Sequence, residues 1–329
     1  MTNKEWFQEA KFGMMVHFGL YSLLGGEWKG KQMKQIGEWA QSYFRIPNAE
    51  YHKLASAFCP IYFDAEEWVK TAKRAGMKYL VVTSKHHEGF ALFKSDASKF
   101  NVVDATSFKR DIIAELAEAC YKHDMKLGLY YSQAIDWSHP HGAGGGIHDD
   151  LNCGVMAWGN DWDYPDAKKK DYKICFEEKI KPQVKEILTK YGDLCLIWFD
   201  TPRNIPKECS LELYDMVKHY QPNCLVNSRI GSGLCKCDYQ STGDNEIPND
   251  DKTGMLYEAP STLNDTWGYK PCDQNWKSAE EVLRIKKHLN DRGINYLLNV
   301  GPDPLGRFPA KAVEILEEVG KRLADFTLS

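Results

Sequence analysis

The sequence has little net charge and no long apolar run, and both absences restrict its partners. Acidic and basic residues almost balance, giving a net charge of −4, and they are spread along the whole chain. This balance argues against a nucleic-acid partner or an anionic membrane surface. No stretch approaches the roughly 18 apolar residues of a membrane-spanning helix, and residues 1–6 show no basic segment of a signal peptide. We therefore expect a cytoplasmic protein with no membrane partner.

The sequence also lacks the cysteine pairs of a zinc site and the glycine-rich motifs of a nucleotide-binding loop. The ten cysteines include no CxxC pair, and Cys235 and Cys237 alone do not provide a zinc site. We expect reduced thiols rather than a disulfide framework. The glycine-rich segment 142–146 has neither GxGxxG spacing nor a following Gly-Lys-Ser/Thr, so it is not a phosphate loop. The sequence predicts no metal and no cofactor.

What the chain does contain is a regular alternation of short apolar runs and helical patterns. Continuous apolar runs are typical of strands that are buried on both faces of a parallel sheet. The expected strands cover residues 12–20, 79–85, 126–132, 194–200, 224–229, 238–242, 256–258 and 295–301. The expected helices cover residues 4–11, 48–57, 64–75, 111–122, 167–190, 207–220, 278–292 and 309–326.

This order predicts the fold class. About eight β/α units in 329 residues fit a single (β/α)8 TIM-like barrel with long βα loops, spanning residues 1–329 as one catalytic domain. A doubly wound sheet is less favoured because no glycine-rich βα turn marks a dinucleotide site. No linker or shift in composition marks a second domain.

Residues able to bind or to do chemistry follow nearly every expected strand. In a barrel of this kind the active site lies at the carboxyl ends of the strands. The strand around residue 198 is the clearest example, because it delivers Asp200 with Trp198 on the same face and Phe199 on the other. The residues at the strand ends are His17, His86, His87, Tyr131, Asp200, Arg229, Asp244, Glu258 and Asn299.

Carboxyl groups together with His, Trp and Arg suit carbohydrate chemistry. Glycoside hydrolysis needs two carboxyl groups, one on each side of the scissile bond. A metal-dependent sugar hydrolase or isomerase is the alternative, but His17 stands without the usual second histidine of an HxH pair. Adjacent His86 and His87 would point to opposite sides of an extended backbone and would not both bind one metal easily. A sugar-binding module, the third class, needs fewer acids.

Nine motifs in order along almost the whole chain carry a family resemblance. They are WFQEAKFGMMVHFGLYS (6–22), GEW (37–39), YLVVTSKHHEGF (79–90), LGLYYS (127–132), IWFD (197–200), NSR (227–229), GDNEIP (243–248), NDTWGY (264–269) and NYLLNVGPDPLGR (295–307). With these motifs the chain resembles the α-L-fucosidases of glycoside hydrolase family 29. It is most similar to the compact bacterial members that act on α-1,6-linked fucose on N-acetylglucosamine.

The resemblance implies a retaining α-L-fucosidase that needs no metal and acts on a fucosylated oligosaccharide or glycoconjugate. Asp200 would be the nucleophile that forms a covalent fucosyl-enzyme, and Asp244 of GDNEIP would be the acid/base, with Glu246 and Glu258 as competitors. Each implied binding residue could instead be a structural one, as for a core tryptophan or a buried histidine. The implied substrate-binding residues are His17, Glu38, Trp39, His86, His87, Tyr131, Trp198, Arg229, Asn245, Glu258 and Trp267.

Two further expectations concern the parts around the site. Many family members continue into a β-sandwich, but here the last expected helix reaches Phe326, so we expect no C-terminal β-sandwich. A neighbouring subunit of a homo-oligomer could supply what that domain supplies elsewhere. The tryptophan-bearing loop 133–165 is the candidate for the leaving-group side of the site, and a surface loop without a substrate role is its alternative.

Overall fold

The computed structural model describes residues 2–142, 158–202, 205–231 and 236–328. Eight parallel strands form one sheet in the order β7-β6-β5-β4-β1-β10-β9-β8. A bridge between Asn227 and Tyr239 joins its two ends, so the sheet almost closes into a barrel whose strands follow one another in chain order. This confirms the predicted TIM-like barrel. The strands are β1 (Phe12–Val16), β4 (Tyr79–Lys85), β5 (Lys126–Tyr131), β6 (Leu196–Phe199), β7 (Leu225–Val226), β8 (Tyr239–Ser241), β9 (Leu256–Thr262) and β10 (Ile294–Val300).

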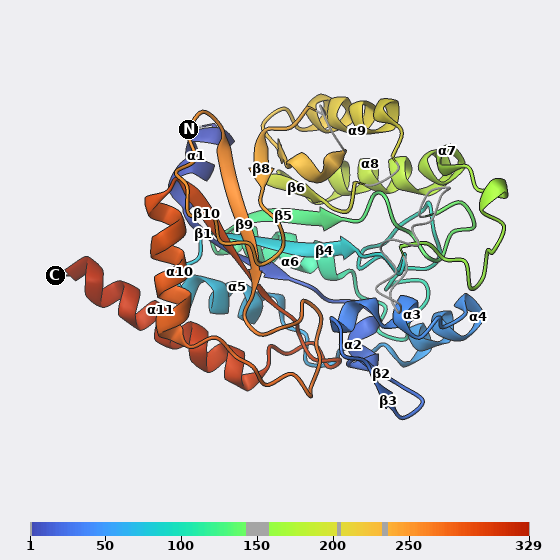
Figure 1. Cartoon of the computed structure of the whole chain (residues 1–329), viewed down its shortest axis with the longest axis horizontal. Helices are drawn as coiled ribbons and strands as arrows, with labels where there is room; N and C mark the ends of the chain where they lie inside the picture. The colour runs from blue at the N-terminus through green and yellow to red at the C-terminus, as the bar shows by residue number, and fades with distance from the viewer. Residues whose placement is uncertain (1, 143–157, 203–204, 232–235, 329) are drawn as a thin grey trace.

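Helices surround most of this barrel (Figure 1). Between β7 and β9 the described residues contain no α-helix, only the 3-10 turn η6 (Ser228–Ile230), so this side of the barrel is covered by irregular chain. The helices outside the strands are α5 (Ala65–Arg74), α6 (Ile112–Lys122), α7 (Tyr172–Cys175), α8 (Lys181–Lys190), α9 (Lys207–Tyr220), α10 (Ala279–Asp291) and α11 (Ala310–Leu328).

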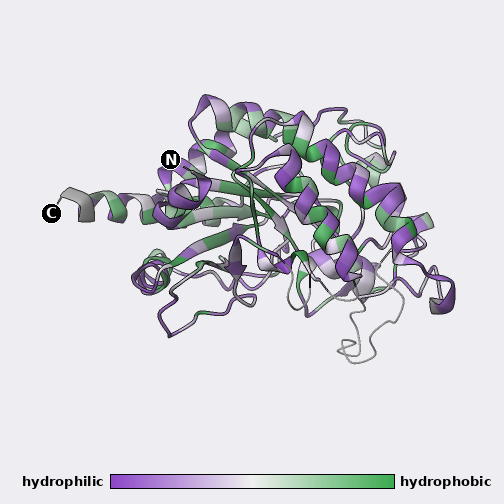
Figure 2. Ribbon diagram, turned by 90° about the horizontal axis from the view of Figure 1, so that it is seen from above, coloured by the Kyte–Doolittle hydropathy of each residue, from purple (hydrophilic) through white to green (hydrophobic). Residues whose placement is uncertain are grey.

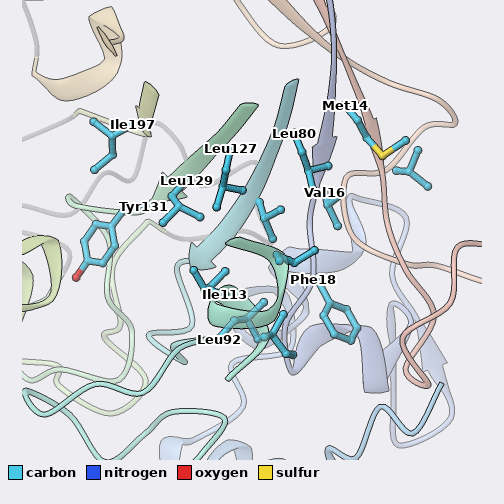
Figure 3. Packing of buried hydrophobic residues seen from close by; sticks show 14 of the residues in the cluster. Met14, Val16, Phe18, Leu80, Leu92, Ile113, Leu127, Leu129, Tyr131 and Ile197 are labelled. Atoms are coloured by element: carbon cyan, nitrogen blue, oxygen red, sulfur yellow. The ribbon is translucent and has the colours of Figure 1, made fainter. Parts of the chain in front are cut away.

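Strand alternation divides the buried side chains into two layers. On β5, Leu127, Leu129 and Tyr131 belong to the large cluster between strands and helices, and Figure 3 shows them on that side. Tyr130 instead belongs to the smaller cluster inside the barrel, together with Trp198 of β6. Figure 2 shows the result, apolar strands in the middle and helices with hydrophilic outer faces. A side chain's place in the sequence therefore decides whether it can reach the barrel axis.

The two ends of the barrel are built differently. At the amino end lies α1 (Asn3–Ala10), where the ring of Phe7 packs 4.9 Å from Tyr239 and 5.9 Å from Tyr79. At the carboxyl end lie short elements, visible beside the tips of β4 and β5 in Figure 1. They are α2 (Tyr21–Leu24), β2 (Glu27–Trp28), β3 (Lys31–Gln32), η1 (Gly37–Trp39), α3 (Ala40–Tyr43), α4 (Asn48–Tyr51) and η2 (His52–Ala57).

The remaining features of the described ranges are a second small sheet, the character of the helices and the state of the cysteines. Besides the barrel, these ranges hold a two-stranded sheet of β2 and β3, and they contain no β-sandwich. None of their helices combines the length and apolar character needed to cross a bilayer. Cysteines with free thiols in the described ranges are Cys59, Cys120, Cys175, Cys195, Cys209, Cys224 and Cys272, whereas Cys153 and Cys235 lie outside these ranges.

Several predicted elements differ from the structure; for example, the strand expected at 256–258 extends to Thr262. The expected helix 167–190 is divided into η4 (Ala167–Lys169), α7, the π-turn η5 (Phe176–Ile180) and α8. Pro182 lies in the first turn of α8 and has no N–H to continue an α-helical ladder, which accounts for the last of these breaks. The strands expected at 12–20 and 224–229 end at Val16 and Val226. His17 and Arg229 therefore lie just beyond their strands.

Candidate active site

One cavity of about 710 Å³ opens at the carboxyl ends of the strands. Its walls come from segments that are far apart in the sequence but meet at this end of the barrel. The residues that line it are Met15, His17, Ile36, Glu38, Trp39, His86, His87, Tyr130, Trp158, Trp198, Asp200, Thr201, Pro202, Arg229, Ser241, Thr242, Gly243, Asp244 and Trp267.

 Ten of the thirteen site residues predicted from the sequence line this cavity. The three that do not are Tyr131, Asn245 and Glu258.

Asp200 lies in this cavity directly after β6 and is held from several sides. Its Oδ2 accepts a hydrogen bond of 2.8 Å from the Tyr130 hydroxyl, and its Oδ1 accepts one of 3.0 Å from Arg229. Its backbone N–H donates to Gln133 Oε1 at 2.9 Å. The residue is 9% exposed, so the carboxylate meets the cavity from a nearly buried position. Trp198 shares its face of the strand, as the sequence predicts.

Arg229 joins Asp200 to the second carboxyl group of the cavity. Its NH1 contacts Asp200, while its NH2 donates to Asp244 Oδ1 at 2.7 Å and to the Thr242 carbonyl at 2.7 Å. Burial alone would lower the pKa of Arg229, but Asp244 and Asp200 raise it above its ordinary value. One guanidinium therefore bridges two carboxylates. The Asp244 side chain is 52% exposed, in contrast to that of Asp200 at 12%.

The opposite wall carries histidines whose tautomers follow from their hydrogen bonds. The hydroxyl of Ser132 donates to the Ile135 carbonyl, so it accepts the 2.7 Å bond from His87 Nδ1. The amide of Asn299 donates to the Trp267 carbonyl, so its Oδ1 accepts from His17 Nδ1 at 2.7 Å. Each ring keeps Nε2 as a lone-pair acceptor.

Burial keeps these imidazoles neutral. It lowers the pKa of His17 to about 4, and it lowers the pKa of both His86 and His87 well below the ordinary value. The Nδ1 atom of His86 is buried and has no hydrogen-bond partner. A wall of neutral imidazoles with free acceptors suits a ligand that is rich in hydroxyl groups.

The expectation that His86 and His87 point to opposite sides is wrong. Both line the cavity, and their ring centroids are 4.0 Å apart. The cause is the backbone, because β4 ends at Lys85 and the chain turns at once, with the Gly89 N–H bonded to the His86 carbonyl at 3.1 Å. The alternation rule of an extended strand does not apply beyond Lys85.

Glu38, Trp39 and Trp267 also line the cavity. Glu38 Oε2 accepts a 2.8 Å bond from the Gly268 N–H, and burial raises the pKa of this carboxyl to about 7. Trp39 packs 5.1 Å from His87, and Trp267 packs 5.3 Å from His17. Both indoles are predicted site residues that line the cavity, and they also fix the imidazole wall.

The predicted tyrosine is wrong by one position. Tyr131 points away from the cavity and donates to Gln183 Oε1 at 2.8 Å, among the core residues of Figure 3. Tyr130 lines the cavity instead and binds Asp200. The signal that could have found it is the period of two: Gly128 and Tyr130 share the inward face of β5, as Trp198 does on its neighbour β6.

Asn245 and Glu258 also lie outside the cavity. Asn245 has a left-handed φ of 56°, and its Oδ1 turns to β9, where the Thr262 N–H donates to it at 2.8 Å. Glu258 is fully buried inside the barrel and accepts from the Trp198 indole at 2.9 Å. Neither side chain lines the cavity as the structure places it. Glu246 is exposed and caps the Gly243 N–H at 2.7 Å.

The loop 133–165 contributes one described residue to the cavity. Trp158 lines it, and its ring packs 5.7 Å from Trp39. Trp137 and Trp162 lie behind it, with ring centroids 6.0 Å apart. Residues 143–157 of the loop are outside the described ranges. Its role on the leaving-group side stays a prediction.

The arrangement of donors bears on metal binding. Within the described ranges, no group of three or more His, Cys, Asp or Glu side chains is placed to hold a metal ion. His17, His86 and His87 are close to one another, but the Nδ1 atoms of His17 and His87 are already used by Asn299 and Ser132. What the cavity offers is two bridged carboxylates, neutral imidazoles and aromatic walls.

The chain is similar to known proteins over almost its whole length. The sequence model described as "Alpha-L-fucosidase" matches residues 1–326. A putative α-L-fucosidase of Caenorhabditis elegans is 30% identical over 96% of this chain, and the tissue α-L-fucosidase of Rattus norvegicus is 30% identical over 97%. The chain spans 64% and 67% of the lengths of these two relatives.

A solved structure is more similar. The α-L-fucosidase AlfC from Lactobacillus casei, in complex with α-L-fucose product, is 52% identical, with a TM-score of 0.93 and coverage of 99% of this chain and 98% of that one. An α-L-fucosidase from Vibrio sp. strain EJY3 is 36% identical with a TM-score of 0.91, covering 98% of this chain and 55% of that one.

Proposed function

The chain belongs to the α-L-fucosidase family of glycoside hydrolases, and on this premise we propose that it is a retaining α-L-fucosidase with Asp200 as nucleophile and Asp244 as acid/base. The observation that carries the proposal is the pair of carboxylates that share the Arg229 guanidinium in one cavity. Retaining glycosidases need two carboxyl groups separated by about 5 Å, whereas inverting ones leave a wider gap for water. Two groups on one guanidinium are near neighbours, which favours the retaining reaction.

In the first step the Asp200 carboxylate attacks C1 of fucose while Asp244 protonates the departing oxygen. The Tyr130 hydroxyl and Arg229 hold the Asp200 carboxylate in place by donating to both of its oxygens. In the second step Asp244 takes a proton from water, which displaces Asp200 and restores the α configuration. The exposed position of Asp244 suits a group that exchanges protons with the leaving group and with water.

Asp244 must release Arg229 before it can act as an acid. In the structure the two groups form an ion pair of 2.7 Å, so the Asp244 oxygen that would carry the proton is engaged by the guanidinium. A fucosyl ring that enters between the carboxyl groups would separate Asp244 from the guanidinium, while Arg229 keeps Asp200 and the Thr242 carbonyl. Substrate binding would then prepare the proton donor.

The fucose itself would be recognised by the imidazole wall. Its hydroxyl groups can donate to Nε2 of His17 and His87, and Glu38 and His86 line the same cavity. Trp267 offers an apolar surface for the methyl side of the sugar. These contacts agree with the roles that the family resemblance implies for the same positions.

We extend the proposal to fucose that is α-1,6-linked to N-acetylglucosamine. The support is a solved structure of an AlfC variant in complex with Fuca(1,6)GlcNAc, which is 52% identical to this chain. Release of fucose from Fucα(1,6)GlcNAc, compared with its α-1,2, α-1,3 and α-1,4 isomers, tests this preference. Equal rates on all four disaccharides would contradict it.

The proposal as a whole is tested with 4-nitrophenyl α-L-fucoside. Wild-type protein should release nitrophenol, and proton NMR at early times should show the α anomer of fucose as the first product. The first appearance of the β anomer would contradict the retaining reaction. Dialysis against EDTA should leave the rate unchanged, whereas loss of activity restored by an added metal would favour the metal-dependent hydrolase instead.

A further inference from the structure

A buried carboxyl group lies directly beneath the cavity, and the catalytic steps proposed above do not use it. We propose that Glu258 is a positioning residue, which fixes Arg229 through the indole ring of Trp198. Arg229 in turn holds the two carboxylates of the cavity. The inference rests on the proposed function, because it concerns how that reaction keeps its nucleophile in place.

Glu258 is placed to hold the indole and not the substrate. It points into the barrel from β9, is 0% exposed and does not line the cavity. Its Oε1 accepts from Trp198 Nε1 at 2.9 Å, and its Oε2 accepts from the Tyr79 hydroxyl at 2.6 Å. Each oxygen therefore binds one donor, one of which belongs to a residue of the cavity wall.

The indole has few ways to keep its place without this acceptor. A tryptophan N–H can only donate, and a buried donor without a partner is costly. One face of the Trp198 ring stacks on Tyr130, with centroids 5.5 Å apart at 16°. The hydrogen bond to Glu258 fixes the remaining rotation of the ring about that stack.

The position of the ring decides the position of Arg229. The guanidinium carbon lies 4.6 Å from the centroid of the Trp198 ring, a cation–π distance. The guanidinium is planar and rigid, so a shift of its support changes its bonds to Asp200 and Asp244 together.

This chain of contacts predicts an effect on the chemical step and little on binding. The imidazole wall that would bind fucose comes from the ends of β1 and β4, and neither His17 nor His87 bonds to Glu258 or Trp198. A misplaced Arg229 would leave Asp200 poorly aimed while fucose still binds. The expected signature is a lower kcat at a similar KM.

Two substitutions of Glu258 separate positioning from simple loss of packing. Glu258→Gln keeps the size of the side chain, an oxygen for the Trp198 N–H and an amide that can donate to the Tyr79 oxygen. Glu258→Ala removes the acceptor. With 4-nitrophenyl α-L-fucoside, Glu258→Ala should lower kcat on the order of 10- to 100-fold with KM within about twofold. Glu258→Gln should retain kcat within about threefold. A Gln variant as impaired as the Ala variant, or an effect mainly on KM, would overturn the inference.

Two matched controls complete the test. Tyr79→Phe removes the other donor to Glu258 at a similar depth, and it should lower kcat much less than Glu258→Ala. In a Trp198→Phe background, which has no indole N–H, Glu258→Ala should add less than about threefold to the loss, because the two changes act on one path. Independent losses that multiply would contradict the proposed path.

The indole N–H signal makes the inference testable even if the proposed function fails. Wild-type protein that hydrolyses no fucoside would refute the proposed function alone. In a ¹H–¹⁵N spectrum of tryptophan-labelled protein, the Trp198 indole signal, assigned with Trp198→Phe, should move upfield in Glu258→Ala and stay close to its wild-type position in Glu258→Gln. An unmoved signal in Glu258→Ala would overturn the inference whatever the activity.

Discussion

The two carboxyl groups that share Arg229 lie in contrasting surroundings. Asp200 follows a buried strand, accepts hydrogen bonds from Tyr130 and Arg229, and donates its backbone N–H to Gln133, a partner set drawn from different segments of the chain. Asp244 follows the short strand β8, its side chain is 52% exposed, and its Oδ1 accepts a 2.7 Å hydrogen bond from Arg229.

 

The contrast matches the different tasks that we propose for the two groups. A nucleophile must be aimed at one carbon atom, and a rigid strand end with several bonds provides that aim. An acid/base must exchange its proton with a leaving group and then with water, which an exposed loop position allows. The barrel around them differs in the same way, since helices cover β4, β5 and β6 while irregular chain covers the region from β7 to β9.

The largest expected effect is at the buried group. Asp200→Ala removes the nucleophile, so hydrolysis of 4-nitrophenyl α-L-fucoside should fall by about 10⁴-fold or more. Added azide should enter the space left by the carboxylate and restore turnover, with β-fucosyl azide as the product. The variant must retain the wild-type circular dichroism spectrum and melting temperature. A folded variant that azide does not rescue would remove Asp200 from the nucleophile's role.

The next effect should depend on the leaving group. Asp244→Ala removes the proton donor, so substrates with poor leaving groups, such as Fucα(1,6)GlcNAc, should lose on the order of 10²- to 10⁴-fold in kcat/KM. The activated aryl fucoside needs less protonation and should lose much less. Glu246→Ala is the matched control, because Glu246 lies on the same exposed segment but outside the cavity. The same selectivity in Glu246→Ala would make Asp244 the wrong choice.

The same contrast explains which parts could be predicted from the sequence. The barrel follows from eight buried apolar runs, and Asp200 follows from one of them, because strand alternation extends to the last residue before Thr201. The prediction for His86 and His87 fails because these residues lie beyond the end of their strand. His86 and His87 share the cavity because the chain turns after Lys85, and the sequence alone does not show that turn.

Three other differences from the prediction have a local physical cause. The sequence predicts Tyr131 as the site residue at the end of its strand, although the phase set by Gly128 places Tyr130 inside the barrel. Asn245 adopts a left-handed backbone and turns its amide oxygen to β9, a conformation that tertiary contacts of the loop decide. Glu258 lies on a regular strand, but its depth in the barrel depends on the register between β8 and β9.

A smaller effect tests the choice between the two neighbouring tyrosines. Tyr130→Phe removes a hydrogen bond to Asp200, and its loss should lower kcat about tenfold, as expected for about 1.4 kcal/mol in a charge-assisted bond. Tyr131→Phe removes a bond to Gln183 in the outer core and should leave kcat nearly unchanged, with a modest loss of stability. Equal kinetic losses in the two variants would contradict the assignment.

The smallest effect concerns stability on the buried side. Burial raises the pKa of Glu88 to about 8, and its Oε1 accepts from the Leu20 N–H at 3.0 Å. The folded protein thus holds a proton that the unfolded chain releases above its ordinary pKa of 4.5, so this group's contribution to stability falls as pH rises from about 5 to 8. Glu88→Gln has no proton to lose, and urea unfolding should show its stability relative to wild type increasing over that range. A difference that is constant with pH would contradict the neutral state of Glu88.

The central claim, that Asp200 forms a covalent bond to fucose, has one direct measurement. A 2-deoxy-2-fluoro-fucosyl fluoride should inactivate the enzyme by slowing release of the intermediate, and peptide mass spectrometry should locate the added sugar. We predict a single modified peptide whose fragments place the sugar on Asp200, with no labelling in Asp200→Ala. A label on Asp244, on Glu258 or on any other residue would contradict this account of the site.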